Sequence, residues 1–178
     1  MILLVSSLLL PGYCLRSGSG LDRALLVKFM QWTYREFYPD QGFSHLAQTV
    51  EQYFSQDTPL WWVEANTNDC TQPGYPVSFP YRRQPVACLW LGNAVDQVKG
   101  DRHAHIFLLY VVPAQRRQGI GGALVRHAEA WAKARGDRQI GLQVFRANQP
   151  ALNLYQKLGY QPVSVWMVKP LLPNPQID

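Results

Sequence analysis

The chain has 178 residues, of which 47% are hydrophobic and 12% aromatic, so it is long enough and apolar enough to bury a full core as one domain. Its net charge is +5 and its isoelectric point is near 9.2, but the basic residues are scattered apart from Arg82-Arg83 and Arg116-Arg117. A nucleic-acid-binding surface needs more clustering than this, so we expect no nucleic-acid partner.

The chain begins with a strongly apolar stretch, residues 1–14, that can be interpreted as a signal peptide or as a strand. It has no Lys or Arg before the apolar run and no clear small-residue cleavage site, which signal peptides carry. We therefore expect a first strand over residues 8–16 and no membrane association.

The three cysteines, Cys14, Cys70 and Cys88, are odd in number and show no CxxC spacing. This argues against a structural zinc site and against a disulfide framework. We expect reduced thiols, no metal and a cytoplasmic location.

Two helices are predicted next, over residues 19–38 and 44–54. The first has Ser19 or Asp22 near its start, apolar residues on one side and Pro39 as its stop. Residues 60–65 and 86–92 are predicted strands, and the polar stretch between them, 66–85, is a loop insertion. After a turn at 96–103, residues 104–112 form a long apolar strand.

A glycine-opened helix follows this strand. Its apolar residues recur at helical spacing, and Gly136 stops it. These apolar residues are Ile120, Ala123, Leu124, Ala128, Trp131 and Ala132. Arg116 and Arg117 lie just before the positive end of the helix dipole, where acidic residues are preferred.

Glycines at the helix start leave its first backbone N–H groups unscreened by side chains, so these groups and the two arginines can close on a phosphate. The plainer alternative is a solvated basic helix start. The Walker pattern needs Lys-Ser or Lys-Thr where Ala123-Leu124 stand. The dinucleotide fingerprint needs a third glycine where Leu124 stands and a tighter turn.

The remaining chain is predicted to form a strand over 140–146, a helix over 150–158 and a closing strand over 163–168. This order gives an α/β (α+β) fold with a mixed, largely antiparallel sheet of six to seven strands flanked by helices.

The motif Arg116-x-x-Gly119-x-Gly121 resembles the pyrophosphate signature of the GCN5-related N-acetyltransferases (GNAT). Downstream, Asn148-x-x-Ala151-x-x-x-Tyr155-x-x-x-Gly159-Tyr160 is similar to the family's last helix and following turn. The resemblance covers a CoA-binding core of about residues 86–169 within a single N-acetyltransferase domain, 1–178. It implies the acyl-CoA N-acyltransferase-like fold and acetyl-CoA as co-substrate.

The resemblance also implies site residues. Backbone groups of Tyr110, Val111 and Val112 would bind the acyl carbonyl and pantetheine, Tyr155 would protonate the leaving thiolate, and Asn148 would cap its helix or bind a pantetheine amide. The pyrophosphate would lie on Arg116, Arg117, Gln118, Gly119, Ile120, Gly121 and Gly122. Core positions for Tyr155 and ordinary sheet pairing for the strand are the structural alternatives.

The general base is open, because members of this family use a glutamate or an ordered water. His105 lies eleven residues before Arg116, in the register of that glutamate in some relatives, and an imidazole suits amine deprotonation at neutral pH. A structural role for His105 is the alternative. His103 shares its strand face, and Glu64 is the other carboxylate to test.

The resemblance implies transfer of acetyl to a primary amine of a small molecule or peptide. Candidates for the acceptor wall are Trp32, Tyr34, Phe37, Tyr38 and Phe43, although for any one of these aromatics core packing is the favoured alternative. The alternatives are a non-catalytic acyl-CoA-binding module and a ribosomal-protein-type N-terminal acetyltransferase. Either a monomer or a homodimer fits.

Overall fold

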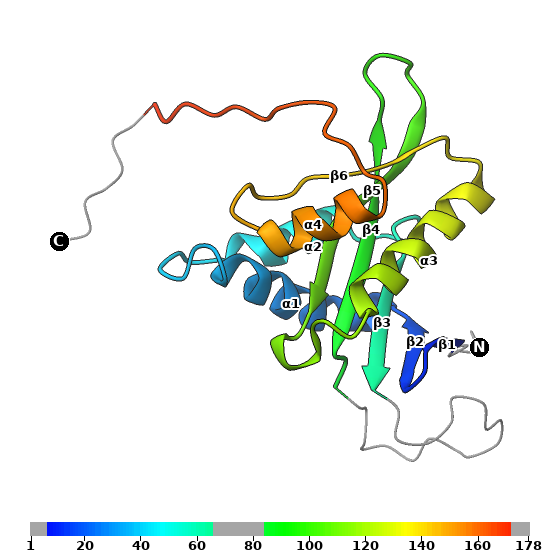
Figure 1. The fold of residues 1–178 in the computed structure, drawn as a ribbon. Coiled ribbons are helices and arrows are strands. Elements are labelled where there is room, and N and C mark those ends of the chain that lie inside the picture. Colours follow the sequence, from blue (N-terminus) through cyan, green and yellow to red (C-terminus); the bar gives the residue numbers. More distant parts are fainter. Residues whose placement is uncertain (1–6, 66–83, 172–178) are drawn as a thin grey trace.

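The computed structural model describes residues 7–65 and 84–171. Within these segments six strands form one sheet in the spatial order β1-β2-β3-β4-β5-β6 (Figure 1). The strands are β1 (Ser7–Leu10), β2 (Tyr13–Ser17), β3 (Leu60–Ala65), β4 (Ala87–Val95), β5 (Arg102–Val111) and β6 (Ile140–Leu142). All neighbours pair antiparallel except β5 and β6, which are parallel. The predicted mixed, largely antiparallel sheet is confirmed.

Helices cover both faces of the sheet (Figure 1). One face carries α3 (Ile120–Arg135) and α4 (Gln149–Lys157), and the other carries α1 (Arg23–Arg35) and α2 (His45–Tyr53). Two short 3-10 helices, η1 (Gly20–Asp22) and η2 (Pro113–Gln115), precede α1 and α3. The sheet therefore separates two apolar cores.

On β4 the two cores draw on alternate residues, as the two-residue repeat of a strand requires: Leu89 packs toward α3 and Trp90 toward α1 and α2. On β5 this alternation is interrupted between Ile106, which packs toward α3, and Leu108, which packs toward α1 and α2. Trp62 and Trp90 are fully buried on the α1/α2 side. Because both faces are covered, the central strands are apolar at nearly every position.

A β-bulge interrupts the pairing of β4 with β5. Trp90 lies opposite Leu108 and Leu91 opposite Ile106, so Phe107 is the extra residue. Its ring crosses Gly92, where an added Cβ would stand 2.1 Å from Phe107 Cε2. Only glycine leaves room for the ring at this position.

Three strand predictions need correction. Residues 8–16 are not one strand but the hairpin β1-β2, because Pro11-Gly12 turns the chain with Gly12 at φ 80°. The strand predicted over 140–146 is confined to Ile140–Leu142. The closing strand over 163–168 does not form: the segment has no regular structure, and Val163, Val165, Trp166 and Met167 are 80–95% exposed.

The other elements agree with their predictions to within a few residues. The predicted first helix begins with η1, where Ser19 and Asp22 form a capping box, and α1 ends at Arg35. Gly136 ends α3 in the left-handed conformation, as expected. Of the predicted insertion, residues 66–83, which include Arg82-Arg83, lie outside the described residues.

The cysteines differ from expectation at one position. Cys14, on β2, is disulfide-bonded, so the prediction of reduced thiols is wrong for this residue. Cys88 is a free thiol in the sheet interior, and burial raises its pKa, which makes it unreactive at neutral pH.

Candidate functional site

The turn between β5 and α3 contains two residues in the left-handed conformation. Arg117 and Gly119 adopt left-handed conformations, with φ of 65° and 85°. Arg117 is the one non-glycine residue with positive φ in the described segments, and such a conformation costs about 1–3 kcal/mol. Residues 116–119 are exposed. This strain is of a kind found at ligand-binding turns.

No side chain of α3 itself offsets the positive end of its helix dipole. Gly119 is its N-cap, no side chain caps it, and its first turn contains no acidic residue. The first four N–H groups of a helix have no intrahelical acceptors. These observations fit the predicted phosphate cradle of Arg116, Arg117, Gln118, Gly119, Ile120, Gly121 and Gly122.

The β1-β2 hairpin braces this turn, which sequence reasoning missed. The Tyr13 hydroxyl lies 2.6 Å from Gln115 Oε1 and 2.5 Å from Gln118 Oε1 and can donate its proton to either. Leu10 Cδ1 is 3.8 Å from the point where a Cβ on Gly119 would stand. The contacts span about a hundred residues of sequence, so no local motif could have indicated them.

Three predicted site elements meet at Gly121. A Cβ added there would stand 3.4 Å from Leu154 Cδ2 of α4 and 4.0 Å from Val111 Cγ2 of β5. Tyr155, the next residue on α4, belongs to the same apolar core and is 8% exposed. The structure therefore brings the cradle, the end of β5 and the Tyr155 helix together.

The sheet opens beside this meeting point. The β5-β6 pairing runs from Ala104 and Ile140 to Ile106 and Leu142 and stops there. Tyr110, Val111 and Val112 lie beyond it, while Val112 N donates to Val86 O on the β4 side at 2.8 Å. An extended ligand can therefore approach the β6-facing edge of these residues.

Asn148 and Tyr155 occupy the two ends of α4. Asn148 is the N-cap, and its side chain accepts a hydrogen bond of 3.2 Å from Ala151 N, as expected for a helix-capping residue. Burial raises the pKa of Tyr155 to about 12. Its phenol therefore keeps its proton at physiological pH and is available as a donor.

His105 lies where β5 still pairs with β6, opposite Gly141. Its ring is 5.6 Å from Phe107, which packs toward α1 and α2, whereas Tyr155 lies in the core on the other face. Burial, and secondarily His103, lower the pKa of His105, so its imidazole is neutral at pH 7. The two predicted catalytic residues therefore lie on opposite faces of the sheet.

Glu64, the other carboxylate considered for the base, is held in an ion pair. Arg16 Nε donates to Glu64 Oε1 at 2.9 Å, and the same guanidinium donates to both oxygens of buried Asp22 at 3.2 Å. Burial opposes the charge of Arg16, but its hydrogen bonds to Asp22 and Glu64 raise its pKa. Glu64 is thus part of a structural charge cluster.

Three of the five predicted acceptor aromatics, Tyr34, Phe37 and Tyr38, pack around one ring that the sequence did not single out. Phe145, which follows β6, has its ring centroid 5.4 Å from Phe37, 5.5 Å from Tyr38 and 6.1 Å from Tyr34. Tyr34 also stacks with Phe43 at 5.9 Å. Phe145 and Tyr38 are 37% and 41% exposed, so this cluster has an accessible surface.

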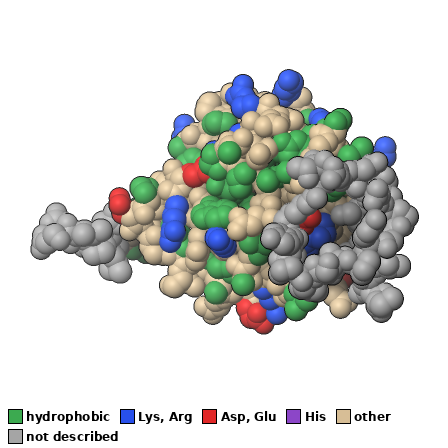
Figure 2. Space-filling model, turned by 90° about the horizontal axis from the view of Figure 1, so that it is seen from below, with side chains coloured by type: hydrophobic (Ala, Val, Ile, Leu, Met, Phe, Trp, Pro, Cys, Tyr) green, Lys and Arg blue, Asp and Glu red, His purple; other side chains and the backbone are tan. Residues whose placement is uncertain are grey.

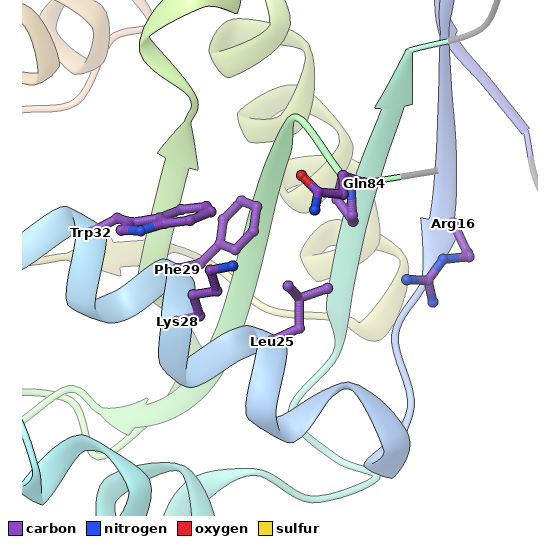
Figure 3. A pocket seen from close by; sticks show the side chains of 7 residues that line it. Arg16, Leu25, Lys28, Phe29, Trp32 and Gln84 are labelled. Carbon is purple, nitrogen blue, oxygen red and sulfur yellow. The ribbon is translucent and has the colours of Figure 1, made fainter. Parts of the chain in front are cut away.

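Two cavities lie along α1 and share Trp32. One, of about 160 Å³, is bounded by α1, Arg16 of β2 and the chain before β4, and Figure 3 shows Phe29, Lys28 and Trp32 extending from α1 beside it. The other is an open groove of about 430 Å³, lined by Trp32, Arg35, Glu36, Tyr110, Val112 and Pro113. This groove reaches the predicted acyl-binding end of β5.

Viewed from below, the surface carries hydrophobic side chains across its middle, with Lys and Arg side chains around them (Figure 2). Within residues 7–65 and 84–171, no group of three His, Cys, Asp or Glu side chains could hold a metal ion. The helices of that part of the chain are too short or too polar to cross a membrane.

Comparisons with known proteins agree with this geometry. A model of the Acetyltransferase (GNAT) family matches residues 26–160. An uncharacterised N-acetyltransferase of Methanocaldococcus jannaschii is 33% identical over 157 residues, which are 86% of this chain and 62% of that protein. An uncharacterised N-acetyltransferase of Bacillus subtilis is 29% identical over 80% of this chain and 99% of its own length. The chain spans less than two thirds of the length of several curated relatives that it matches.

Solved structures share the fold. A GCN5-related N-acetyltransferase from Ralstonia eutropha superposes with a TM-score of 0.64 at 24% identity, covering 90% of this chain and 99% of that one. A predicted acetyltransferase from Clostridium acetobutylicum, solved with acetyl-CoA, gives 0.65 at 19% identity, covering 89% and 96%. Fold, motifs and the family match over most of the chain lead to one conclusion: the chain belongs to the acetyltransferase (GNAT) family.

Proposed function

We propose that this protein transfers an acetyl group from acetyl-CoA to a primary amine of a small molecule or peptide. The observation that carries the proposal is the meeting of three elements at Gly121. There the uncapped start of α3, the end of β5 that has no partner on its β6 side, and the Tyr155 helix surround one point. The start of α3 suits the pyrophosphate, the end of β5 suits the pantetheine arm, and the Tyr155 helix suits the leaving sulfur.

Each group has a distinct task in this proposal. The N–H groups of residues 117–122 and the Arg117 side chain bind the pyrophosphate, and Gln118 is steadied by Tyr13. Of Tyr110, Val111 and Val112, Val111 is the residue whose N–H faces away from β4, because Val112 N donates to Val86 O and backbone groups alternate in direction along a strand. The Val111 N–H therefore binds pantetheine or polarises the acyl carbonyl. Holding the two substrates in the reactive geometry lowers the activation barrier by about 7–11 kcal/mol when the positioning is ideal.

Two titrating side chains, half-buried His105 and buried Tyr155, supply the proton transfers in this proposal. The amine must lose a proton before its nitrogen bonds to the acyl carbon, and His105, neutral at pH 7, can accept it. As the carbon–sulfur bond breaks, Tyr155 holds a proton for the thiolate. A water chain in place of His105 is the competing arrangement.

The cytoplasmic location stays a prediction. The disulfide at Cys14 counts against the reduced thiols on which that prediction was based. Monomer and homodimer both fit the fold described above.

The test has two readings on the same protein. Saturating acetyl-CoA should raise the melting temperature, since a ligand at a hundred times its Kd stabilises the folded state by about 2.7 kcal/mol. Release of free thiol is then followed with a panel of small amines and peptides. No thermal shift with millimolar acetyl-CoA would overturn the proposal.

The same panel separates the alternatives. A thermal shift without thiol release from any amine or peptide indicates an acyl-CoA-binding module. Release only with peptides that carry a free N-terminus indicates the ribosomal-protein type. Release with small primary amines supports the proposal in its small-molecule form.

A further inference from the structure

The strained residue of the cradle turn has a fixed neighbour on each side. Arg117, whose φ is 65°, lies between Arg116 and Gln118. Arg116 Nε donates to Val111 O at 2.8 Å, and its Nη2 donates to Glu36 Oε1. A residue other than glycine keeps a left-handed conformation only where its surroundings impose it. The contacts of Gln118 therefore matter as much to the turn as those of Arg116.

A single hydroxyl joins the two glutamines that flank the arginines. The Tyr13 oxygen lies 2.6 Å from Gln115 Oε1 and 2.5 Å from Gln118 Oε1. A phenol donates one proton and can also accept one, and a glutamine amide exchanges its oxygen and nitrogen by turning over. The hydroxyl can therefore donate to one glutamine and accept from the other, which closes a chain of hydrogen bonds across Arg116-Arg117.

The sheet supports Tyr13 from both sides. Tyr13 is the first residue of β2 and pairs with Leu10 of β1 and with Ala65 of β3. Tyr13 and Leu10 both pack against the core on the α3 side, and Leu10 also lies 3.8 Å from the Cβ position of Gly119. A side chain on paired strands keeps its position better than one on a loop. The hairpin therefore gives the exposed turn a fixed point of attachment.

We propose that the β1-β2 hairpin is part of the acetyl-CoA site and that Tyr13 is a positioning residue for the pyrophosphate. Its hydroxyl holds Gln115 and Gln118 together, and this keeps Arg117 in the conformation in which the turn binds the anion. Tyr13 itself touches neither substrate. The inference rests on the proposed function and adds to it a residue from outside the two sequence motifs.

Titration calorimetry with CoA tests this without an acceptor amine. Tyr13→Phe keeps the ring packing and removes the hydroxyl, so CoA should bind about two- to tenfold more weakly, the effect of losing a typical hydrogen bond. Tyr53→Phe makes the same change on α2, where the ring is 48% exposed and lies beside Phe107, and should leave CoA affinity unchanged. Unchanged affinity in Tyr13→Phe, or an equal loss in both variants, would overturn the inference.

Steady-state kinetics separates positioning from general damage. With any amine accepted in the panel described above, Tyr13→Phe should raise the KM for acetyl-CoA about two- to tenfold, and kcat should stay within about twofold of wild type. S-acetylpantetheine has no pyrophosphate, so its kcat/KM should be the same in the two proteins. A loss confined to kcat, or an equal loss with both thioesters, contradicts a role at the pyrophosphate.

The strained residue supplies a third test. Asparagine adopts a positive φ more readily than arginine, so Arg117→Asn lowers the need for Tyr13 to hold the turn. Arg117→Asn also removes a charge and weakens CoA binding on its own, so the loss caused by Tyr13→Phe is measured within each background. That loss should be smaller in the Arg117→Asn background. The same loss in both backgrounds would show that Tyr13 does not act through Arg117.

Failure of the broader function looks different. If wild type does not bind CoA, the acetyl transfer proposal falls first. If wild type binds CoA and Tyr13→Phe binds it identically, only the role of Tyr13 falls.

Discussion

Leu154 of α4 lies over Gly121 of α3, with 3.4 Å between its Cδ2 atom and the point where a Cβ on Gly121 would stand. That distance is ordinary van der Waals contact, so a methyl group fits. Gly121 therefore tolerates alanine in the unliganded protein, and a branched side chain must push toward the cradle.

Gly121→Val should remove CoA binding and leave the protein folded. The β-branched side chain occupies the space that the pyrophosphate needs at the first turn. Gly121→Ala is the matched variant, and its melting temperature should equal or exceed that of wild type because alanine favours a helix over glycine by about 0.5–1 kcal/mol. Calorimetric CoA titration of both variants, with circular dichroism, checks this. Wild-type affinity in Gly121→Val would place the cradle elsewhere.

Tyr155→Phe should lower turnover by about ten- to a thousandfold while keeping CoA affinity within a few-fold, the effect of losing one general acid. The ring packing is retained, so stability should change little. Tyr160→Phe is the control, because the Tyr160 ring lies 5.5 Å from that of Tyr155 in the same core. Steady-state rates decide. Equal activity in the two variants would make Tyr155 a core residue.

If His105 is the general base, kcat/KM should depend on pH in a particular way. Its pKa is lowered below the ordinary 6.5, so kcat/KM should fall as pH drops through that lowered value, where the imidazole takes up a proton. His105→Ala should remove this acidic limb and reduce the neutral rate. His103→Ala should move the limb toward 6.5, because His103 contributes to the shift. If the dependence of kcat/KM on pH is the same in His105→Ala as in wild type, water and not His105 accepts the proton of the amine.

Asp22→Asn should destabilise the fold by about 3–5 kcal/mol, the cost of breaking a buried ion pair. Asp22 is 1% exposed and accepts hydrogen bonds from Arg16 and from Ser19 N at 2.8 Å. Glu51→Gln, at a pair whose side chains are 43% and 71% exposed, should cost less than about 1 kcal/mol. Urea unfolding of wild type, Asp22→Asn and Glu51→Gln measures these differences in the free energy of unfolding. Similar midpoints would show that the Arg16 cluster adds no stability.

Much of the fold could be predicted because local patterns decide it. The β3 bounds and the Gly119–Gly136 limits of α3 follow from apolar runs and glycine positions. The hairpin was missed because an apolar run on both sides concealed the turn signal of Pro11-Gly12. The closing strand was wrong because β-propensity at 163–168 cannot supply a pairing partner.

The candidate site could also be predicted only in part. Cradle and α4 motifs are contiguous in sequence, so their residues could be named. The Glu36–Arg116 pair joins residues 80 apart, and Tyr13 reaches Gln118 across 105. Such contacts depend on how distant elements dock, and one sequence contains no signal for them.

The exposed segment at 163–168 has a consequence for handling the protein. VSVWMV contains no charge and no proline, which is the composition of segments that stack into intermolecular sheets. Pro162 before it, and Lys169 and Pro170 after it, act as gatekeepers that keep such stacking short. Solubility at high concentration therefore depends on these three flanking residues, and Lys169→Ala should lower it more than a substitution in the exposed turn at Lys99.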